Sequence, residues 1–391
     1  MRDYKLALKV GEIITPFEII RDGVIAIDEN GRIAYVGTSK DFSGESENVI
    51  EARDKIAVPG YIDIHIHGAA GVDTMDAKYE SLKKLSEFLV SKGVTSFLPT
   101  TVTSPLEDIY KALKAIREAM HKGTGYAKIL GAHVEGPYFS KERAGAQDVR
   151  YLREPKLEEI KYILDEYGDV IIRFTIAPEL PGAIDAIRYI TRRGILVAMG
   201  HTNATYDEAI KAINAGAKLA NHIYNGMRVF HHRDPGILGA VLTRDDVYAE
   251  IIVDEVHHHN AARKVVIRCK GTDKVALISD SIMATGLADG EYVLGKQKII
   301  IKNGISRLPD GTIAGSTLTL DRAVKNTVEN LDVTLKEAIK MASFVPAQIL
   351  GISHEVGVIR EGYIADIAIL SKDLSVAMTI VSGEIVFRGN R

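Results

Sequence analysis

The chain has few of the features that mark several large classes of protein. Its 391 residues include a single cysteine, Cys269, which excludes an intramolecular disulfide framework and suits a reducing compartment. The net charge is only −3, so there is neither a basic field for nucleic acid nor a polybasic patch for a membrane. No apolar run reaches the ~18 residues that a membrane span needs, and the first ten residues lack the cleavage pattern of a signal peptide. We therefore expect a cytoplasmic globular enzyme, in which any metal is held by His, Asp and Glu.

From residue 56 onward, eight apolar runs alternate with stretches typical of helices. The runs are KIAVPGYIDIHIHG, GVTSFLPTT, AKILGAHVEG, VIIRFTIAPE, GILVAMGH, AKLANHIYNG, VYAEIIVD and KVALISDS. Buried parallel strands read as continuous apolar runs, so eight such units predict an α/β protein built on a (β/α)8 TIM barrel. An open doubly wound sheet is the alternative, but the Gly-rich phosphate fingerprint that usually follows its first strand is absent.

Two helix starts are readable from their capping patterns. Ser104-Pro105-Leu106-Glu107 reads as a capping box with proline at the first helical position. Thr205-Tyr206-Asp207-Glu208 reads as another, and that helix is expected to end near Gly216.

The two ends of the chain have strand patterning of another kind. Alternating apolar and polar residues occur in DGVIAIDENGRIAYVG near the start, and strand patterns return in GVIREGYIADIAIL and TIVSGEIVFRGN near the end. Chain ends commonly lie close together, so we expect residues 1–55 and 355–391 to form one small β-sandwich domain. The barrel, residues 56–354, would then be inserted within it.

Polar side chains stand at the ends of the apolar runs, where the chemistry of a barrel is found. His65 and His67 are separated by one residue, so in a strand they project to the same side and can grip one ion. Similarly placed residues follow four later runs, and these are Glu135, His201, His222 and Asp280. Imidazole and carboxylate ligands suit Zn, Fe, Mn or Co and disfavour Mg or Ca. The sequence therefore predicts one metal site at the mouth of the barrel.

This constellation resembles the amidohydrolase superfamily, whose members carry HxH after the first strand, histidines after the fifth and sixth strands and an aspartate after the eighth. Many members bridge two metals with a carbamylated lysine on a middle strand, and here Glu135, in HVEGP, occupies the comparable place. With GHTNATYDEA, ANHIYNGM, HHRDPG and IAGSTLTL, the chain closely resembles N-acetylglucosamine-6-phosphate deacetylases over nearly its whole length. The resemblance implies deacetylation of an amino-sugar phosphate by a divalent-metal enzyme with one or two ions per subunit.

The resemblance also implies roles for individual residues. Glu135, His201 and His222 match ligands of the principal metal, and His65 with His67 makes a second ion possible. Asp280 matches the catalytic acid and base. The substrate-binding residues that it implies are Asn225, Gly226 and Arg233 at the sugar phosphate, His257 as a further contact, Ala314 and Gly315 in a loop bordering the sugar, and Gln147. Relatives are often dimers whose partner subunit reaches the phosphate, so a homodimer is expected.

Gln147 is a departure from the family pattern, because many relatives have a histidine twelve residues after the ligand glutamate. Glutamine can donate and accept hydrogen bonds but cannot carry a proton. We therefore expect substrate binding, and no proton transfer, from Gln147. Of the triplet at residues 257–259, only His257 is expected in the site, since adjacent strand residues point to opposite sides. His258, His259, His231 and His232 are expected in loops or at the surface, and Cys269 as a packed small hydrophobe within a helix.

Two other readings stay open at this point. One is a different amidohydrolase activity on the same scaffold, acting on N-acetylgalactosamine 6-phosphate or a cyclic amide, which only the phosphate segment would distinguish. The other is a catalytically silent scaffold or binding protein that never holds a divalent ion.

Overall fold

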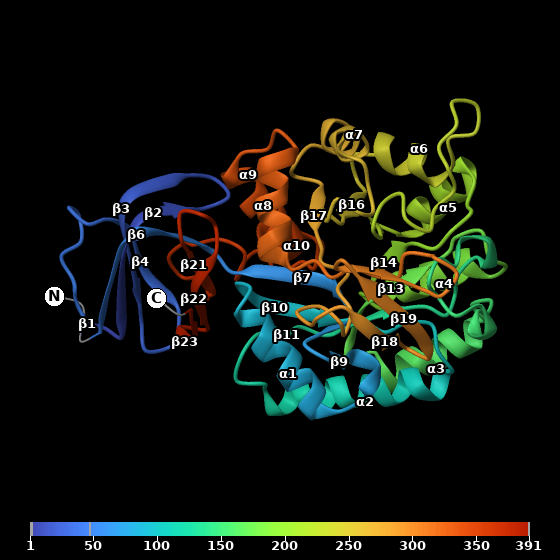
Figure 1. The fold of residues 1–391 in the computed structure, drawn as a ribbon, viewed down its shortest axis with the longest axis horizontal. Coiled ribbons are helices and arrows are strands. Elements are labelled where there is room, and N and C mark those ends of the chain that lie inside the picture. Colours follow the sequence, from blue (N-terminus) through green and yellow to red (C-terminus); the bar gives the residue numbers. More distant parts are fainter. Residues whose placement is uncertain (1–2, 47, 390–391) are drawn as a thin grey trace.

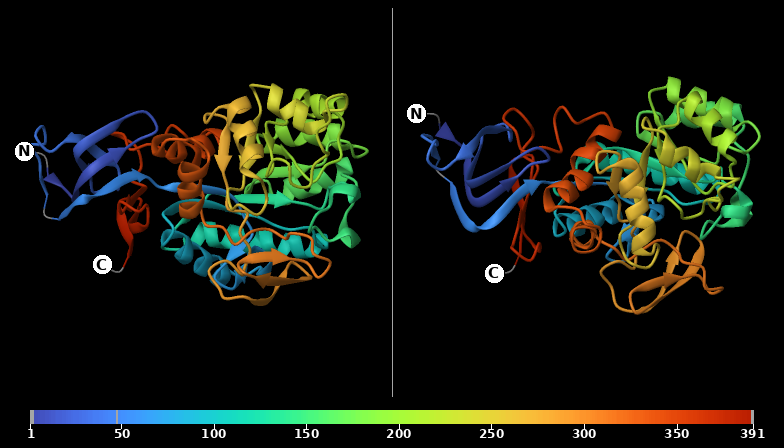
Figure 2. Two further views of the ribbon diagram at one scale, coloured as in Figure 1. Left: turned by 45° about the horizontal axis from the view of Figure 1, so that its top comes forward. Right: turned by 90° about the horizontal axis from the view of Figure 1, so that it is seen from above.

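The computed structural model describes residues 3–46 and 48–389, and these residues form a small β-rich part and a larger α/β part (Figure 1). The first and last described strands, β1 (Asp3–Tyr4) and β23 (Glu384–Arg388), both belong to the smaller part. Figure 2 shows the same elongated two-part outline from two further sides. No described helix is long and apolar enough to cross a membrane.

All eight predicted apolar runs contain strands that pair in parallel. They are β7 (Tyr61–Ile66), β10 (Val94–Pro99), β11 (Lys128–Ile129) with β12 (Ala132–Glu135), β13 (Ile171–Ile176), β14 (Leu196–Met199), β15 (Leu219–Ala220), β16 (Tyr248–Ile251) and β17 (Val275–Leu277). Their order is β11-β10-β7 in one parallel sheet and β12-β13-β14-β15-β16-β17 in another. The two sheets meet at a parallel bridge between Thr100 and His133. At the other end, beyond β17, the backbone N–H of Asp280 donates to the carbonyl of His65 over 2.9 Å. The runs are apolar because most of their side chains are buried on both faces.

Helices cover the outer side of these strands (Figure 1). They are α1 (Tyr79–Val90), α2 (Leu106–Lys122), α3 (Leu157–Tyr167), α4 (Ala183–Arg192), α5 (Tyr206–Ala215), α6 (Gly236–Thr243), α7 (Asn260–Lys270), α8 (Leu320–Asn330), α9 (Leu335–Ala342) and α10 (Phe344–Ile349), with short 3-10 helices at Thr74–Asp76, Lys141–Arg143 and Val149–Tyr151. The capping box of α5 is confirmed, and its cap at Gly216 has the positive φ of 120° that favours glycine. The capping box expected for α2 was wrong, because Pro105 itself is the N-cap residue and no side chain caps the helix.

The smaller part is built on one hydrogen-bonded sheet of seven strands in the order β23-β22-β21-β6-β2-β3-β4. Besides β23, the strands of this sheet are β2 (Leu6–Ile14), β3 (Ile19–Ile27), β4 (Ile33–Thr38), β6 (Val49–Pro59), β21 (Ile367–Leu370) and β22 (Val376–Val381). A separate short strand, β5 (Glu45–Ser46), pairs with β1. Strands from the two ends of the chain therefore join in one sheet. The pairing differs from the two separate sheets of a β-sandwich, because β6 hydrogen-bonds to β2 on one side and to β21 on the other. β6 also runs without interruption across the expected boundary between residues 55 and 56.

A three-stranded antiparallel sheet that the sequence analysis did not anticipate follows β17. It comprises β18 (Gly290–Leu294), β19 (Gln297–Lys302) and β20 (Ile305–Arg307). Its residues Leu294, Ile299 and Ile301 pack with Val102 and Ile282 from segments that follow β10 and β17. The sheet therefore lies over the carboxyl ends of the parallel strands. A small ribbon of β8 (Gly68–Ala69) and β9 (Val72–Asp73) follows β7 directly.

Candidate metal centre and active site

Glu135 lies at the centre of the polar cluster that the sequence analysis predicted. It is the last residue of β12, and its carboxylate is almost wholly buried. Its Oε1 atom lies 3.3 Å from Nε2 of His65, 3.2 Å from Nε2 of His222 and 3.6 Å from Nε2 of His201. Its Oε2 atom lies 3.4 Å from Nε2 of His67. The structure thus brings the five predicted metal ligands together, since the carboxyl ends of neighbouring parallel strands meet at one rim.

Asp280 joins this cluster from the segment after β17. Its Oδ1 atom lies 3.3 Å from Nε2 of His67 and 3.5 Å from Nε2 of His65. Two groups have ligand atoms close enough to share one ion, namely His65 with Glu135 and His222, and His65 with His67 and Asp280. His65 is common to both groups.

The donor set fits a divalent transition metal. Nitrogen and carboxylate oxygen donors suit Zn, Fe, Mn or Co, and no sulfur or oxygen cage is present among the described residues around Glu135. Nε2 of His65 is buried and makes no hydrogen bond, although it points at two carboxylates. A buried polar atom without a partner is costly, and coordination to an ion would satisfy it.

The backbone is strained at three of these positions. His201, His222 and Asp280 have φ values of 45°, 20° and 50° respectively, in the left-handed region that non-glycine residues seldom adopt. Each of them follows the end of its strand, so the turn directs its side chain back toward Glu135. Such strain persists where the surrounding structure holds it and is concentrated at functional sites.

The charged groups of the cluster shift one another's pKa values. Burial lowers the pKa of His65, but the neighbouring carboxylates, with Glu135 foremost, outweigh burial and raise it to about 9. Burial raises the pKa of Glu135, but the surrounding imidazoles hold it well below its usual value. The pKa of Asp280 is lowered in the same way by His65 and His67, against burial, and these contacts raise the pKa of His67 in turn. An ion that binds this cluster would therefore compete with protons for His65 and His67.

The cluster opens into a cavity of about 230 Å³. Predicted substrate-binding residues that line it are Gln147, Asn225, Gly226, His257 and Gly315. Gly226 has a φ of 58°, and a Cβ atom there would come within 2.7 Å of Nδ1 of His201, so the position requires glycine.

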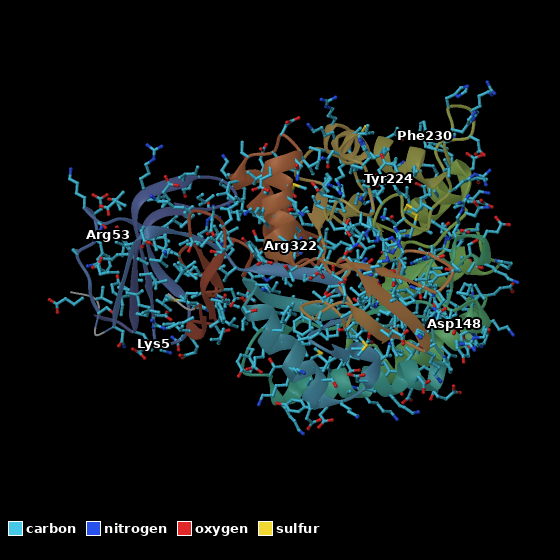
Figure 3. The ribbon with its side chains drawn as sticks, in the orientation of Figure 1. Lys5, Arg53, Asp148, Tyr224, Phe230 and Arg322 are labelled. Carbon is cyan, nitrogen blue, oxygen red and sulfur yellow. The ribbon has the colours of Figure 1, made fainter. Side chains whose placement is uncertain are left out.

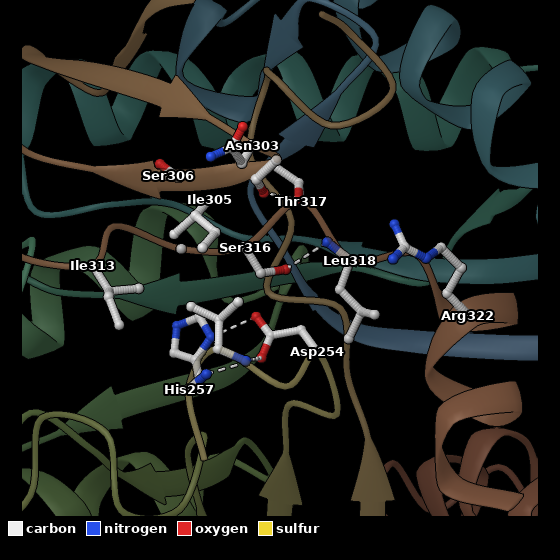
Figure 4. A pocket seen from close by; sticks show the side chains of 13 residues that line it. Asp254, His257, Asn303, Ile305, Ser306, Ile313, Ser316, Thr317, Leu318 and Arg322 are labelled. Atoms are coloured by element: carbon white, nitrogen blue, oxygen red, sulfur yellow. Dashed lines mark hydrogen bonds and ion pairs between the residues drawn. The ribbon is translucent and has the colours of Figure 1, made fainter. Parts of the chain in front are cut away.

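A second cavity of about 190 Å³ adjoins the first one and shares His257, Ile313 and Gly315 with it (Figure 4). Nδ1 of His257 lies 2.7 Å from Oδ2 of Asp254, which fixes the imidazole between the two cavities. Burial raises the pKa of Asp254, but its hydrogen bond with His257 outweighs burial and lowers it to about 2.

Gln147 is buried and engaged at both ends of its amide. Its Nε2 donates to Oε2 of Glu135 over 2.9 Å, and its Oε1 accepts from the backbone N–H of Thr103 over 2.9 Å. Nε2 also lies 3.5 Å from Nε2 of His201. Gln147 therefore contacts the metal-ligand cluster directly, and its role as a substrate contact stays a prediction.

Two predicted substrate residues lie outside the main cavity. Arg233 is exposed in the loop between β15 and α6, where its Nη1 lies 3.0 Å from Nε2 of His232. This loop projects from the larger part of the molecule, and it carries the exposed Phe230 (Figure 3). Ala314 is fully buried beside Gly315.

Sequence reasoning missed a set of buried polar residues beneath the cluster. Arg173 on β13 and Glu250 on β16 are fully buried and form an ion pair, and Asn221 and His133 lie close to them. Burial raises the pKa of Glu250, but Arg173 outweighs burial and holds it below its usual value. The signal that could have found them was a single charged residue inside an apolar run, as in VIIRFTIAPE and VYAEIIVD.

The prediction for Cys269 was wrong. His258 lies in the loop between β16 and α7, as expected, but it is buried, and its Nε2 lies 2.9 Å from Nδ2 of Asn225, so it supports a predicted substrate residue. Cys269 lies in α7 but is exposed, because it falls on the outer face of that helix. His231 and His232 are exposed, as expected.

Comparisons with known proteins agree with this geometry. The model of the amidohydrolase family matches residues 56–386. An N-acetylglucosamine-6-phosphate deacetylase of Vibrio furnissii is 41% identical over 368 residues, which cover 94% of this chain and 91% of that protein. An N-acetylgalactosamine-6-phosphate deacetylase of Escherichia coli O157:H7 is 38% identical over 338 residues, which cover 86% of this chain and 89% of that protein. The solved structure of a Mycobacterium smegmatis N-acetyl-D-glucosamine-6-phosphate deacetylase mutant, in complex with N-acetyl-D-glucosamine-6-phosphate, matches with a TM-score of 0.92 at 31% identity and covers 98% of this chain and 99% of that one. This chain belongs to the amidohydrolase family.

Proposed function

We propose that this chain is a metal-dependent deacetylase that hydrolyses the acetamide of N-acetyl-D-glucosamine 6-phosphate to glucosamine 6-phosphate and acetate, in amino-sugar catabolism or recycling. The observation that carries the proposal is the convergence of four histidines and two carboxylates at the mouth of one cavity, around Glu135. Similar proteins also support the proposal, because this chain resembles deacetylases of this substrate over nearly its whole length.

Glu135, His201 and His222 would hold the principal ion, and His65 with His67 a second one. The donor atoms favour Zn, Fe, Mn or Co, with one or two ions per subunit. A divalent ion bound here would supply Lewis-acid chemistry, which activates water at neutral pH and polarises a carbonyl group. Gln147 fixes the orientation of the Glu135 carboxylate, since both the oxygen and the nitrogen of its own amide are hydrogen-bonded.

Asp280 would move the proton. Its carboxylate faces the cluster and the cavity, and its lowered pKa keeps it ionised at neutral pH, ready to accept a proton from the attacking water. The same group can then return that proton to the departing amine nitrogen, because acid and base roles alternate along such a path. Products are acetate and the free amino sugar phosphate.

The sugar phosphate would bind along the cavity wall, at Asn225, Gly226 and His257, with Gly315 and Ala314 bordering the sugar. Arg233 offers a bidentate guanidinium for the phosphate. Arg233 does not line the cavity of its own chain, and its loop projects from the larger part of the molecule (Figure 3), which supports a homodimer in which this loop of one chain reaches the cavity of the other.

For the architecture, we propose a closed (β/α)8 barrel of residues 56–354 inserted in a small domain of residues 1–55 and 355–391. The bridge at Thr100 and the hydrogen bond from Asp280 to His65 join the two parallel sheets at both ends, which supports a closed barrel. The single cysteine supports a cytoplasmic location.

Acetate release tests the function. Apoprotein should be reconstituted separately with Zn, Fe, Mn and Co and assayed with N-acetylglucosamine 6-phosphate. We expect turnover with at least one ion and none without an ion. A fully loaded protein that releases no acetate from this substrate would refute the proposal, and a protein that never holds a divalent ion would favour a silent scaffold.

N-acetylgalactosamine 6-phosphate is the second candidate substrate, because a relative 38% identical to this chain carries that name. The two sugars differ in the orientation of one hydroxyl. Comparison of kcat/KM for the two substrates decides between them, since this ratio measures discrimination in the transition state.

A further inference from the structure

A closed ring of contacts lies beneath the candidate metal centre. Arg173 and Glu250 form an ion pair with no exposed surface on either side chain. Oε2 of Glu250 lies 3.0 Å from Nδ1 of His65, on the side of the imidazole that faces away from the cluster, and also accepts the backbone N–H of His222 over 3.2 Å. Glu250 therefore contacts two of the candidate metal ligands.

Arg173 completes the ring on the other side. Its Nη2 donates to Oδ1 of Asn221 over 2.6 Å, and Nδ2 of Asn221 donates to Oε1 of Glu135 over 3.1 Å. Its Nη1 donates to the backbone carbonyl of Ile64 over 2.7 Å, next to His65 in β7. One guanidinium thus fixes groups that contact both His65 and Glu135.

His65 differs from the other three histidines of the cluster in what its Nδ1 atom meets. Nδ1 of His67 lies 3.2 Å from the carbonyl of Thr100, that of His201 3.1 Å from the carbonyl of Arg143, and that of His222 3.2 Å from the carbonyl of Asn225. Nδ1 of His65 meets a carboxylate instead. All four rings direct Nε2 toward Glu135. A carboxylate partner at Nδ1, however, makes the imidazole a stronger metal ligand than a neutral carbonyl partner does.

A buried ion pair costs free energy unless its geometry is well satisfied, and hydrophobic residues of similar volume often fill such a place with equal or greater stability. The position of Arg173 and Glu250 therefore needs an explanation other than stability. Their contacts converge on His65, which belongs to both candidate ion-binding groups, and on Glu135, which belongs to one.

We propose that Glu250 and Arg173 are positioning residues for the metal centre. Glu250 holds the Nδ1 proton of His65, so that Nε2 presents its lone pair to the ion. Arg173 fixes Glu250 and, through Asn221, the angle of the Glu135 carboxylate. The inference rests on the proposed function only in assuming that the cluster binds divalent ions.

The test is ion binding by full-length variants, with Co²⁺ followed by its visible spectrum and with Zn²⁺ followed by metal analysis. Glu250→Gln keeps an acceptor but loses the charge, and Glu250→Asp keeps the charge but is one methylene too short to hold His65. We expect each change to weaken binding at the sites that use His65 by about 10-fold to 100-fold. The cobalt spectrum should change as the imidazole reorients.

The matched control is Asp366→Asn. Asp366 is also a buried carboxylate, paired with Lys128 over 2.5 Å, and lies between the sheet of the smaller part and β11, away from the cluster. This variant should lower the midpoint of thermal unfolding while binding ions as the wild type does. Arg173→Lys keeps the charge and should retain more ion affinity than Arg173→Met.

Wild-type ion affinity and an unchanged cobalt spectrum in either Glu250 variant would overturn the proposal. Equal losses of ion affinity in Asp366→Asn would also overturn it, because the effect would then be one of stability alone. A wild-type protein that binds ions but releases no acetate would refute the proposed function and leave this inference standing, whereas a wild type that binds no ion would refute both.

Discussion

Replacement of Asp280 with asparagine separates proton transfer from ion binding. The two side chains have nearly the same shape, so the asparagine would fit the space beside His65 and His67 without disturbing the strand ends. The amide, however, can neither take a proton from water nor return one to a leaving amine. The group formed by His65, Glu135 and His222 does not include Asp280 and should keep its ion, while the group that does include it should bind its ion more weakly.

The expected size of the effect follows from the role of the residue. General acid–base catalysis contributes about 10²-fold to 10⁴-fold, so kcat should fall by that factor, which corresponds to about 3–5 kcal/mol in the activation free energy. The lowered pKa of Asp280 means that the wild type is fully ionised at neutral pH, so the whole effect should be visible there. KM should change far less than kcat.

The assay is acetate release from N-acetylglucosamine 6-phosphate at saturating substrate, with the ion content of each sample measured in parallel. Asp185→Asn makes the same chemical change on the exposed face of α4 and should leave kcat unaltered. A kcat for Asp280→Asn within tenfold of the wild type, at equal ion content, would remove Asp280 from the mechanism. Complete loss of all bound ions would contradict the separation of roles and make Asp280 primarily a ligand.

Three further predictions address the ion, the phosphate and the stability of the site. Chelation should abolish acetate release, and one of Zn, Fe, Mn or Co should restore it; full activity in metal-free protein, verified by metal analysis, would contradict this. Arg233→Ala should raise KM for the phosphorylated sugar far more than for the unphosphorylated one, and equal effects on both in steady-state assays would argue against a phosphate contact. Burial lowers the pKa of His258 from its usual value of 6.5 to about 4, so its contribution to folding is complete above about pH 6.5 and is lost as the pH falls toward 4. Between pH 7.5 and pH 5 the wild type should lose about 2 kcal/mol more unfolding free energy in urea than His258→Gln does, and parallel losses in the two proteins would show that His258 is not the group responsible.

The sequence alone was enough to predict the parallel strands and the polar residues at their ends. Each of the eight apolar runs forms a strand, because a segment buried on both faces must be apolar throughout whatever its neighbours are. The polar residues His65, Glu135 and His222 could be recognised because they interrupt such runs at the end, where a parallel strand reaches the rim. The helix cap at Thr205 was equally local, since its partners lie within one turn.

Only the tertiary structure decided which groups meet. Arg173 and Glu250 each look like one charge in an apolar run, and their contact with each other and with His65 depends on the packing of separate strands. His258 is polar and lies in the loop between β16 and α7, yet it is buried and contacts Asn225. The antiparallel sheet of β18–β20 was missed although Asn303-Gly304 is a typical hairpin turn, because its place over the site follows from long-range contacts. The local pattern predicts which segments form buried strands, whereas the tertiary structure decides the partner of a buried charge, because the two residues are distant in the sequence.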